Sequence, residues 1–539
     1  MQAPTEQELQ AGRQALHSTK PAIQTFEVTD TREGLPHLLS NISVLENTAN
    51  ILKTTLGPYG RDKVLINSNN QFTVTNDGAT ILKEMNSKHP ILGLLKEVSE
   101  CQDKNIGDGT TSVCLVFVEI LKQLVNLIDS GFDISEIIYT ISQIETDALK
   151  YLDGLKEMID RENVPEYIEL VAGTALNSKI LRSHKKQFSE MFQQLLTVDL
   201  EHEESIAIKK VSGGSLEDSV VLNGVVFEKT FSFAGHEQLP KYFKNPKIAC
   251  LDIELEWKSE RDNAEARISS LKSFREFVDA EWKLITDRLD TIINRGAQVV
   301  LSKKPIGDFA TQYFAKKGVF CAGRVPSEDL RRIAALTGTQ IYSSTSFVKL
   351  GECETFEEKD VGGVRYNFLE ISPKSINSDN KSINNGNKNG CLTFLLRGPG
   401  EEFLNEVERS LHDAIIVLKR FLKDLKIVTG GGYIEMKISQ YLRNKEIDTK
   451  HALVYKSVAR ALEIIPNTLA RNFGLDNILE MQRLRYLISN GKKAIMSLEG
   501  AIESEEIKEP LEIKVSLIKT SFQAVRCVLG LDSSFVINQ

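Results

Sequence analysis

The stretch Lys104–Val113, KNIGDGTTSV, sets two glycines around one aspartate directly before a long apolar run. Gly107 and Gly109 would let the backbone approach an anion closely, and Thr110–Ser112 would supply amide and hydroxyl donors at the positive end of the following helix. Asp108 would repel a bare phosphate, so its presence favours a hard cation such as Mg²⁺ between the two. The stretch therefore indicates a magnesium-nucleotide site, or else a Gly-Asp-Gly turn that only caps a helix.

Further glycine turns surround this stretch. TLGPYGRDK (55–63) ends one predicted helix, TNDGAT (75–80) precedes another, and TGGGY (429–433) separates two helical patterns far downstream. Each turn is ordinary by itself, but the turns at 57–60, 76–78 and 107–109 lie within about sixty residues of one another and favour a shared ligand. The standard nucleotide signatures are missing, because the sequence has no G-x-x-x-x-G-K-[ST], no third glycine of G-x-G-x-x-G and no kinase H-R-D triplet.

Composition limits the function classes. The chain has 539 residues, of which 41% are hydrophobic and 26% charged, as expected for about three or four globular domains. The net charge is -8 and no long basic run occurs, which argues against nucleic-acid binding. The longest apolar run, Val113–Ile128, contains Glu119 and Lys122, and the N-terminus is polar, so neither membrane insertion nor export is indicated. The seven scattered cysteines suit reduced cytosolic thiols.

Periodicity predicts helical ends around a mixed centre. Apolar spacing predicts a helix from Leu35 to Gly57, KVLI and FTVT predict a hairpin, and helix is expected from 81 to 128 with a break at the Gly107–Gly109 turn. Between Ser205 and Leu369, strand patterns alternate with helical ones, which indicates an inserted α/β domain. An Asn-rich stretch, predicted to be an exposed loop, follows before helices resume.

These features together resemble group II chaperonins. TTLGPYGRDKVL, TNDGATIL, GDGTTSV and the late GGG resemble the nucleotide-binding segments of that family, in the same order. Longer stretches, such as NPKIACLDIELEWKSERDNAEARI and VVLSKKPIGDFATQYFA, are similar to one subunit type of the eukaryotic cytosolic chaperonin TRiC/CCT. The resemblance covers nearly the whole chain.

The resemblance implies an α/β multidomain fold with a helical equatorial domain, an intermediate domain and an inserted α/β apical domain with a lid protrusion. The expected divisions, in chain order, are a flexible tail (1–24), the first part of the equatorial domain (25–154), the first part of the intermediate domain (155–219), the apical domain (220–373), the second part of the intermediate domain (374–413, with the Asn-rich loop at 375–390) and the second part of the equatorial domain (414–539).

The resemblance also implies a function. The chain would be a cytoplasmic, ATP-hydrolysing subunit of a hetero-oligomeric double ring, with eight subunits per ring, that encloses unfolded polypeptides and assists their folding. Two alternatives stay open: a ring subunit with a structural or binding role and little ATP turnover of its own, and a small-molecule phosphotransferase. The phosphotransferase would need an acceptor constellation, and the central segment offers no pattern of that kind.

Site residues follow from the family segments. The resemblance implies that Asp77 and Asp413 are catalytic and position the attacking water, and that Asp108 is the Mg²⁺ ligand. The residues implied to bind ATP are Leu56, Gly57, Pro58, Gly109, Thr110, Thr111, Ser112, Asn177, Ser178, Lys179, Gly431, Glu509 and Lys514.

Three features depart from the family pattern. Tyr433 and Phe473 stand where the family usually has alanine, and the stretch Asn490–Ile507 lacks a clear Gly-x-Asp near the ribose. The residues expected near the phosphates thus match the family pattern, whereas those expected near the adenine depart from it.

The predicted helix in Pro326–Gly338 resembles the apical helix that faces the ring cavity. Helical spacing predicts that its apolar residues pack inward and leave a polar face. The resemblance implies that this face contacts charged client segments and that Ser259–Ser273 is the lid protrusion; the alternative is an ordinary solvated helix face. The inward set is Leu330, Ile333, Ala334 and Leu336, and the set available to the cavity is Glu328, Arg331, Arg332 and Ala335.

Overall fold

The computed structural model describes residues 34–66, 72–85, 89–200, 202, 205–228, 236–256, 271–345, 347–371, 390–447 and 449–532. Three expected features fall wholly or largely outside these residues: the tail at 1–24, residues 375–389 of the Asn-rich loop and residues 259–270 of the lid segment.

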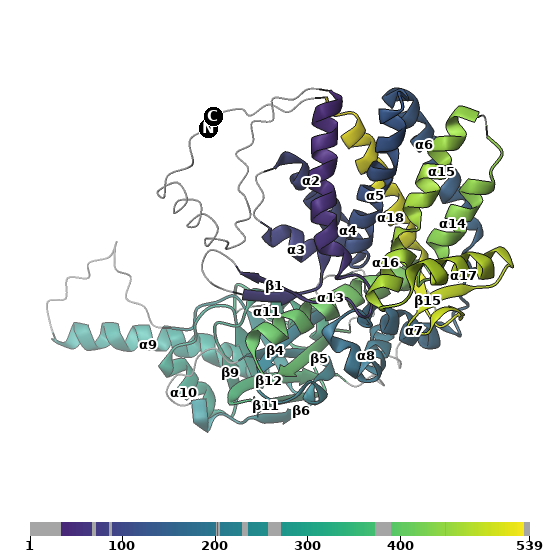
Figure 1. Cartoon of the computed structure of the whole chain (residues 1–539). Coiled ribbons are helices and arrows are strands. Elements are labelled where there is room, and N and C mark those ends of the chain that lie inside the picture. The colour runs from purple at the N-terminus through teal and green to yellow at the C-terminus, as the bar shows by residue number, and fades with distance from the viewer. Residues whose placement is uncertain are drawn as a thin grey trace, which may run out of the picture. The chain divides into compact units, whose positions relative to one another are not determined.

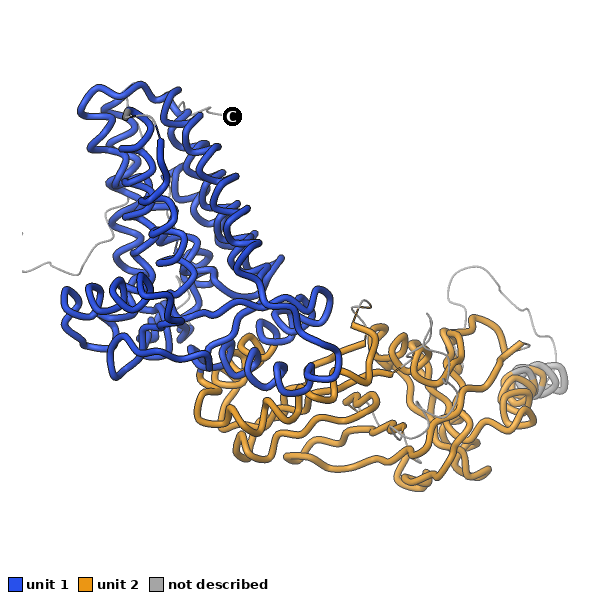
Figure 2. The backbone as a smooth tube through the Cα atoms, turned by 90° about the vertical axis from the view of Figure 1, so that its right-hand side faces the viewer, with its two compact units in different colours: residues 1–179, 412–539 blue, residues 180–411 orange. Residues whose placement is uncertain are grey.

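The chain forms two compact units (Figure 2). Unit 1 comprises residues 1–179 and 412–539, and unit 2 comprises residues 180–411. The insertion expected between Ser205 and Leu369 lies entirely in unit 2. The two units do not separate an intermediate domain, so the division into three domains stays a prediction.

Unit 1 is mainly helical. Its helices are α2 (Leu35–Lys53), α3 (Gly78–Glu84), α4 (Pro90–Ile106), α5 (Thr110–Asp129), α6 (Ile134–Gly154), α7 (Val164–Leu176), α14 (Tyr433–Asn444), α15 (Thr449–Leu462), α16 (Ile464–Asn472), α17 (Asn477–Ser489) and α18 (Leu511–Leu529), together with the part of α13 (Glu401–Asp424) from residue 412 onward.

Helix α5 forms the centre of unit 1. Its side chains at Val113, Phe117, Leu121 and Leu124 are fully buried, and α2, α15 and α18 pack around it (Figure 1). The helix is long and apolar enough to cross a membrane, but 61% of its most apolar window is buried inside the fold. Its apolar character is therefore explained by the core it builds, which holds the Gly107–Gly109 turn in place.

Short sheets complete unit 1. The predicted hairpin is confirmed, because β1 (Lys63–Ile66) pairs antiparallel with β2 (Phe72–Thr75). A three-stranded sheet has the order β17-β14-β3, and β15 pairs with β16. These strands are β3 (Glu157–Met158), β14 (Lys426–Thr429), β15 (Ala494–Ser497), β16 (Gly500–Glu503) and β17 (Lys508–Pro510).

The helix expected from 81 to 128 contains a second break. Helix α3 ends before Met85, which has an extended backbone, and α4 begins at Pro90 with His89 as its N-cap. Proline has no backbone N–H and a fixed φ, so it suits the first turn of a new helix and not the interior of a continuous one. The break at Gly107–Gly109 is confirmed.

Unit 2 is an α/β structure with two sheets. The six-stranded sheet has the order β4-β13-β5-β12-β11-β6, and the four-stranded sheet has the order β10-β7-β8-β9, in which β7, β8 and β9 run parallel. Parallel strands need crossover connections, and α9 and α10 supply them.

The strands of unit 2 are β4 (Ile206–Ser212), β5 (Val220–Glu228), β6 (Tyr242–Lys244), β7 (Lys247–Leu251), β8 (Val299–Ser302), β9 (Phe320–Ala322), β10 (Gly351–Glu352), β11 (Thr355–Val361), β12 (Val364–Glu370) and β13 (Leu392–Gly398). The helices are α8 (Lys185–Phe192), α9 (Leu271–Asn294), α10 (Asp308–Lys316) and α11 (Ser327–Thr337), with the 3₁₀ helices η1 (Ile180–His184), η2 (Gln193–Thr197), η4 (Leu216–Asp218) and η5 (His236–Gln238).

Helix α11 confirms the inward set and corrects one outward residue. The four residues of the inward set are buried as predicted, and Glu328, Arg331 and Ala335 are exposed. Arg332 is not available to a cavity, because its side chain is 3% exposed. Its guanidinium donates to the Leu392 carbonyl (2.7 Å) and the Thr393 hydroxyl (3.0 Å) of β13, and the Asp329 carboxylate, 3.8 Å away, balances the buried charge.

The cysteines are consistent with the reduced state. All seven are described, and none forms a disulfide.

Candidate functional site

The Gly107–Gly109 turn leaves the start of α5 uncapped. Gly107 ends α4 with φ 78°, and Gly109 precedes α5 with φ 79°, a left-handed conformation that favours glycine at both positions. No described side chain caps the first turn of α5. Its backbone N–H groups therefore keep hydrogen-bonding capacity for an anion at the positive end of the helix.

Asp108, between these glycines, is held by its own turn. The Gly109 N–H donates to Asp108 Oδ1 (2.6 Å), and the Gln102 amide donates to the Asp108 carbonyl (2.9 Å). Asp108 is partly buried, and its carboxylate is largely surrounded by protein atoms. This burial, reinforced by the charge of Glu509, raises the pKa of Asp108 to about 6. A nearby cation would favour its ionised form.

Asp77 is fixed as an ionised carboxylate. It is the N-cap of α3, and it accepts hydrogen bonds from the Thr80 N–H (3.0 Å), the Thr80 hydroxyl (2.8 Å) and the Thr110 hydroxyl (2.9 Å). Burial alone would raise the pKa of Asp77, but Lys179 and these hydrogen bonds outweigh it and keep the pKa below its usual value. The bond from Thr110 joins the start of α5 to the start of α3.

Lys179 and Asp413 form a buried ion pair. Lys179 Nζ lies 2.7 Å from Asp413 Oδ2, and the two side chains are 10% and 9% exposed. Burial opposes the charge of Lys179, but Asp413, Asp77 and Asp108 together raise its pKa. Asp413 also lies 4.0 Å from His412 Nδ1, and interaction with the Asp413 carboxylate raises the pKa of His412. The structure thus brings together Asp77, Asp108, Lys179 and Asp413 as the resemblance implied.

Asp103 is a further carboxylate at this site that the sequence reasoning missed. It lies in the last turn of α4, and its backbone carbonyl accepts the Gly107 N–H at 2.8 Å. Burial, with the charges of Asp413 and Asp77, raises the pKa of Asp103 to about 6. The available signal was its position just over one helical turn before Asp108.

The charge balance of these residues fits a magnesium nucleotide. The carboxylates of Asp77, Asp103, Asp108 and Asp413 all interact electrostatically with one lysine, Lys179. A bare polyphosphate would be repelled by this excess of negative charge, whereas Mg²⁺ would offset it. The described residues contain no group of three side chains arranged to hold a metal ion, so further ligands would come from phosphate and water, as is usual for Mg²⁺.

Asn177 and Ser178 lie at the end of α7, next to Lys179. Asn177 caps the helix, and the Ser178 carbonyl accepts a hydrogen bond from the side chain of Asn76, the residue before Asp77. This bond ties the predicted nucleotide-sensing loop to the turn that carries Asp77.

Leu56, Gly57 and Pro58 form the turn that follows α2. Gly57 has φ 85°, and the side chain of Leu469 leaves no space for a Cβ at this position. The Leu56 carbonyl accepts a hydrogen bond from the Asn472 amide at 2.8 Å. The turn is therefore held by the end of α16.

Gly431 lies in a tight turn after β14. Its φ is 64°, and a Cβ here would lie 2.9 Å from Ile495 Cβ, so a side chain would be strained. Beside this turn, buried Lys514 Nζ lies 2.7 Å from Glu509 and 2.9 Å from Glu435. Burial opposes the charge of Lys514, but the two carboxylates outweigh it and raise its pKa. Lys514 thereby fixes the position of Glu509.

The two aromatic departures occupy defined places. Tyr433 is 8% exposed in the core of unit 1, with the Lys437 ammonium 5.9 Å from its ring centre. Phe473 packs edge-on against Tyr59, with ring centres 5.7 Å apart and an interplanar angle of 78°.

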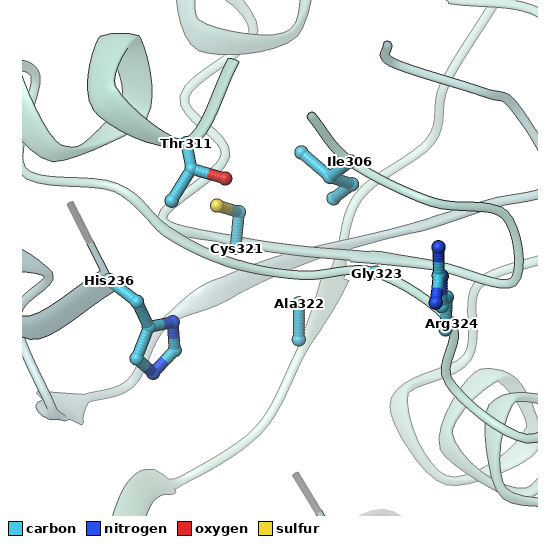
Figure 3. Close-up of a pocket in the computed structure, with 7 residues that line it drawn as sticks. All are labelled: His236, Ile306, Thr311, Cys321, Ala322, Gly323 and Arg324. Atoms are coloured by element: carbon cyan, nitrogen blue, oxygen red, sulfur yellow. The ribbon is translucent and has the colours of Figure 1, made fainter. Parts of the chain in front are cut away.

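A small cavity in unit 2 lacks the size and the reactive groups of an active site. It is lined by His236, Ile306, Thr311, Cys321, Ala322, Gly323 and Arg324, and its volume of about 10 Å³ suits one water molecule (Figure 3). The Thr311 hydroxyl and the Cys321 thiol point toward each other in this view. Burial raises the pKa of Cys321 to about 12, so the thiol is a poor nucleophile at neutral pH.

Comparisons with known proteins identify the family of this chain. The model of the TCP-1/cpn60 chaperonin family matches residues 48–537. The chain is 44% identical over 522 residues to T-complex protein 1 subunit eta of Encephalitozoon cuniculi, covering 95% of this chain and 98% of that protein. It is 40% identical over 529 residues to the human protein of that name, covering 95% of each. The Dictyostelium discoideum protein of that name is 41% identical over 539 residues, covering 96% of this chain and 93% of that protein. The chain therefore belongs to the TCP-1/cpn60 chaperonin family.

Proposed function

We propose that the chain is an ATP-hydrolysing, eta-type subunit of a hetero-oligomeric cytosolic chaperonin. The observation that carries the proposal is the cluster around Lys179, in which Asp77 and Asp413 flank one buried cation next to the uncapped start of α5. Family membership and the names of the relatives support the same activity.

In this proposal the phosphates bind at the start of α5, where Gly109 lets the backbone approach them closely and the N–H groups of Thr110, Thr111 and Ser112 are the donors. Asp108 would hold Mg²⁺, which would neutralise phosphate charge when bound. The Leu56–Pro58 turn, Asn177, Ser178, Gly431 and Glu509 would complete the ATP site.

Hydrolysis would depend on orientation more than on a strong base, because phosphoryl transfer has a loose transition state. Asp77 would orient the attacking water as a fixed, ionised acceptor. Asp413 would share this role, and its ion pair with Lys179 would hold it in place until the terminal phosphate attracts the ammonium.

The proposal includes an assembly with eight subunits per ring and unfolded polypeptide as client. Within unit 2, the exposed side chains of Glu328, Arg331 and Ala335 on α11 are the proposed client contacts. The equatorial, intermediate and apical divisions given above are proposed for this chain as part of the same fold.

The test is nucleotide labelling of this chain in the assembled complex with 8-azido-ATP. Asp108→Ala should weaken labelling, whereas Asp77→Ala and Asp413→Ala should retain it. Asp129→Ala, an exposed carboxylate at the far end of α5, is the matched control and should leave labelling unchanged. Labelling that does not depend on Asp108 would contradict the proposed site.

A further inference from the structure

The turn after α2 needs external support to hold one shape. Gly57 adopts a left-handed backbone, the Gly60 N–H bonds to the Gly57 carbonyl (2.9 Å), and the Arg61 N–H bonds to the Thr54 carbonyl (2.8 Å). We call residues 57–60 the Gly57–Gly60 loop. Its two glycines give it large conformational freedom in isolation, so ordering it has an entropic cost.

The end of α16 provides this support at the base of the loop. Asn472 Nδ2 donates to the Lys53 carbonyl (2.9 Å) and the Leu56 carbonyl (2.8 Å), which binds the last turn of α2 to α16. Leu469, on the preceding turn of α16, lies against Gly57.

Phe473 supports the tip of the loop. Its ring meets the Tyr59 ring edge-on at 5.7 Å and 78°, within the favourable range for an aromatic pair. Phe473 packs against the core of unit 1 on its other side, whereas Tyr59 is 39% exposed. The contact therefore joins a partly exposed loop residue to a partly buried residue that packs against the core.

We propose that Phe473 is an affinity-determining residue, which acts through Tyr59 to hold the Gly57–Gly60 loop in its nucleotide-binding shape. The inference rests on the proposed function, because it assumes that Leu56, Gly57 and Pro58 contact ATP. A loop that is ordered before binding costs less to immobilise on binding, so the ring pair strengthens nucleotide binding without entering the reaction.

The experiment measures the concentration of magnesium 8-azido-ATP that gives half-maximal labelling of this chain in the assembled complex. Phe473→Ala should raise that concentration about two- to tenfold. This range is the interaction free energy of an aromatic pair converted to a ratio of equilibrium constants. Tyr59→Ala should have the same effect, and the double variant should be no worse than either single one. The fraction of bound nucleotide that is hydrolysed should stay at the wild-type value, because Phe473 acts on binding alone.

Matched variants separate the ring contact from general packing. Tyr441→Ala removes a ring from another aromatic pair of unit 1, with Tyr151 at 4.2 Å, and should leave labelling unchanged. Phe473→Leu keeps an apolar side chain without the ring, and should weaken labelling as Phe473→Ala does. If Phe473→Ala does not assemble, the partly exposed Tyr59→Ala gives the same reading.

The outcomes distinguish the role proposed for Phe473 from the proposed function of the chain. Wild-type affinity in Phe473→Ala or Tyr59→Ala, with labelling still dependent on Asp108, would overturn the role of Phe473 and leave the proposed function intact. No Asp108-dependent labelling of the wild-type chain would overturn both. If Phe473→Ala and Tyr441→Ala raise the half-maximal labelling concentration equally, the effect is a general loss of packing. That result would also overturn the role proposed for Phe473.

Discussion

Lys179 Nζ and Asp413 Oδ2 lie 2.7 Å apart although 234 residues separate them in the sequence. Their ion pair connects the short segment after α7 to the middle of α13, and both side chains are nearly buried. A buried pair is expensive to break because the remaining charge has no partner. The contact therefore keeps Asp413 in place beside Asp77.

Lys179→Met should destabilise this part of unit 1 and slow hydrolysis. Removing the cation leaves Asp413 buried without its partner, and we expect a loss of about 3–5 kcal/mol in the local opening free energy. Hydrogen exchange of the α7 and α13 peptides in the assembled complex measures this. Lys156→Met is the control, because its pair with Asp153 is open to solvent and should contribute little to stability. Equal losses in both variants would contradict the role given to Lys179.

Asp103 should make unit 1 less stable as pH rises through about 6. Its folded pKa of about 6 lies above the ordinary value of 3.8, so ionisation is disfavoured in the folded state. The destabilisation is absent well below the ordinary value and complete above about pH 6. Asp103→Asn should therefore strengthen hydrogen-exchange protection of α4 at pH 7.5 by about 1 kcal/mol, a figure reduced for the solvent that reaches this half-buried group.

Part of the pH dependence should persist in Asp103→Asn, because Asp108 also has a raised pKa. Asp129→Asn, on an exposed position, should leave the protection of α4 unchanged. Weaker protection in Asp103→Asn at pH 7.5 would show that the Asp103 carboxylate stabilises the fold instead.

Removal of Mg²⁺ should abolish tight nucleotide binding. Four carboxylates around one lysine repel a bare polyphosphate, so chelation with EDTA should reduce 8-azido-ATP labelling of this chain at least tenfold. In Asp108→Ala, labelling should already be weak and should respond less to EDTA. Labelling that is equally strong with and without EDTA would contradict a magnesium site.

Substitution of Arg332 should destabilise unit 2 far more than substitution of Arg331, although the two residues are neighbours on α11. Arg332→Ala removes the donor for two acceptors on β13, and we expect it to destabilise unit 2 by roughly 3 kcal/mol. Arg331→Ala changes an exposed residue and should cost less than about 0.5 kcal/mol. Hydrogen exchange of the β13 peptide compares the two. Photoreactive residues at positions 331 and 335, and not at 332, should crosslink a client in the open ring.

Sequence patterns predicted local elements well and long-range contacts poorly. Apolar spacing was sufficient for α2 and for the inward face of α11, since burial of apolar side chains decides both. The glycine turn before α5 was readable because positive φ restricts residue choice. Arg332 was placed wrongly because its acceptors belong to β13, about sixty residues away, and no helical period reveals them.

The site shows the same limit. Asp108 was visible in its own turn, but Asp103 gained significance only because α13 brings Asp413 next to α4. The contact between Phe473 and Tyr59 likewise depends on the packing of α16 against the turn after α2. Family resemblance supplied Asp413 and Lys179, for which residue patterns alone favour solvated surface positions.

The central claim is that this chain hydrolyses ATP with its own residues. The most direct measurement labels the assembled complex with 8-azido-ATP carrying ³²P at either the α- or the γ-phosphate, crosslinks at successive times, and compares the two signals on this chain. We predict that the γ-to-α ratio falls with time in the wild type and stays near its starting value in Asp413→Ala, whose early labelling is normal. A ratio that stays constant in the wild type as well would contradict the account and identify a ring subunit that binds ATP with little turnover of its own.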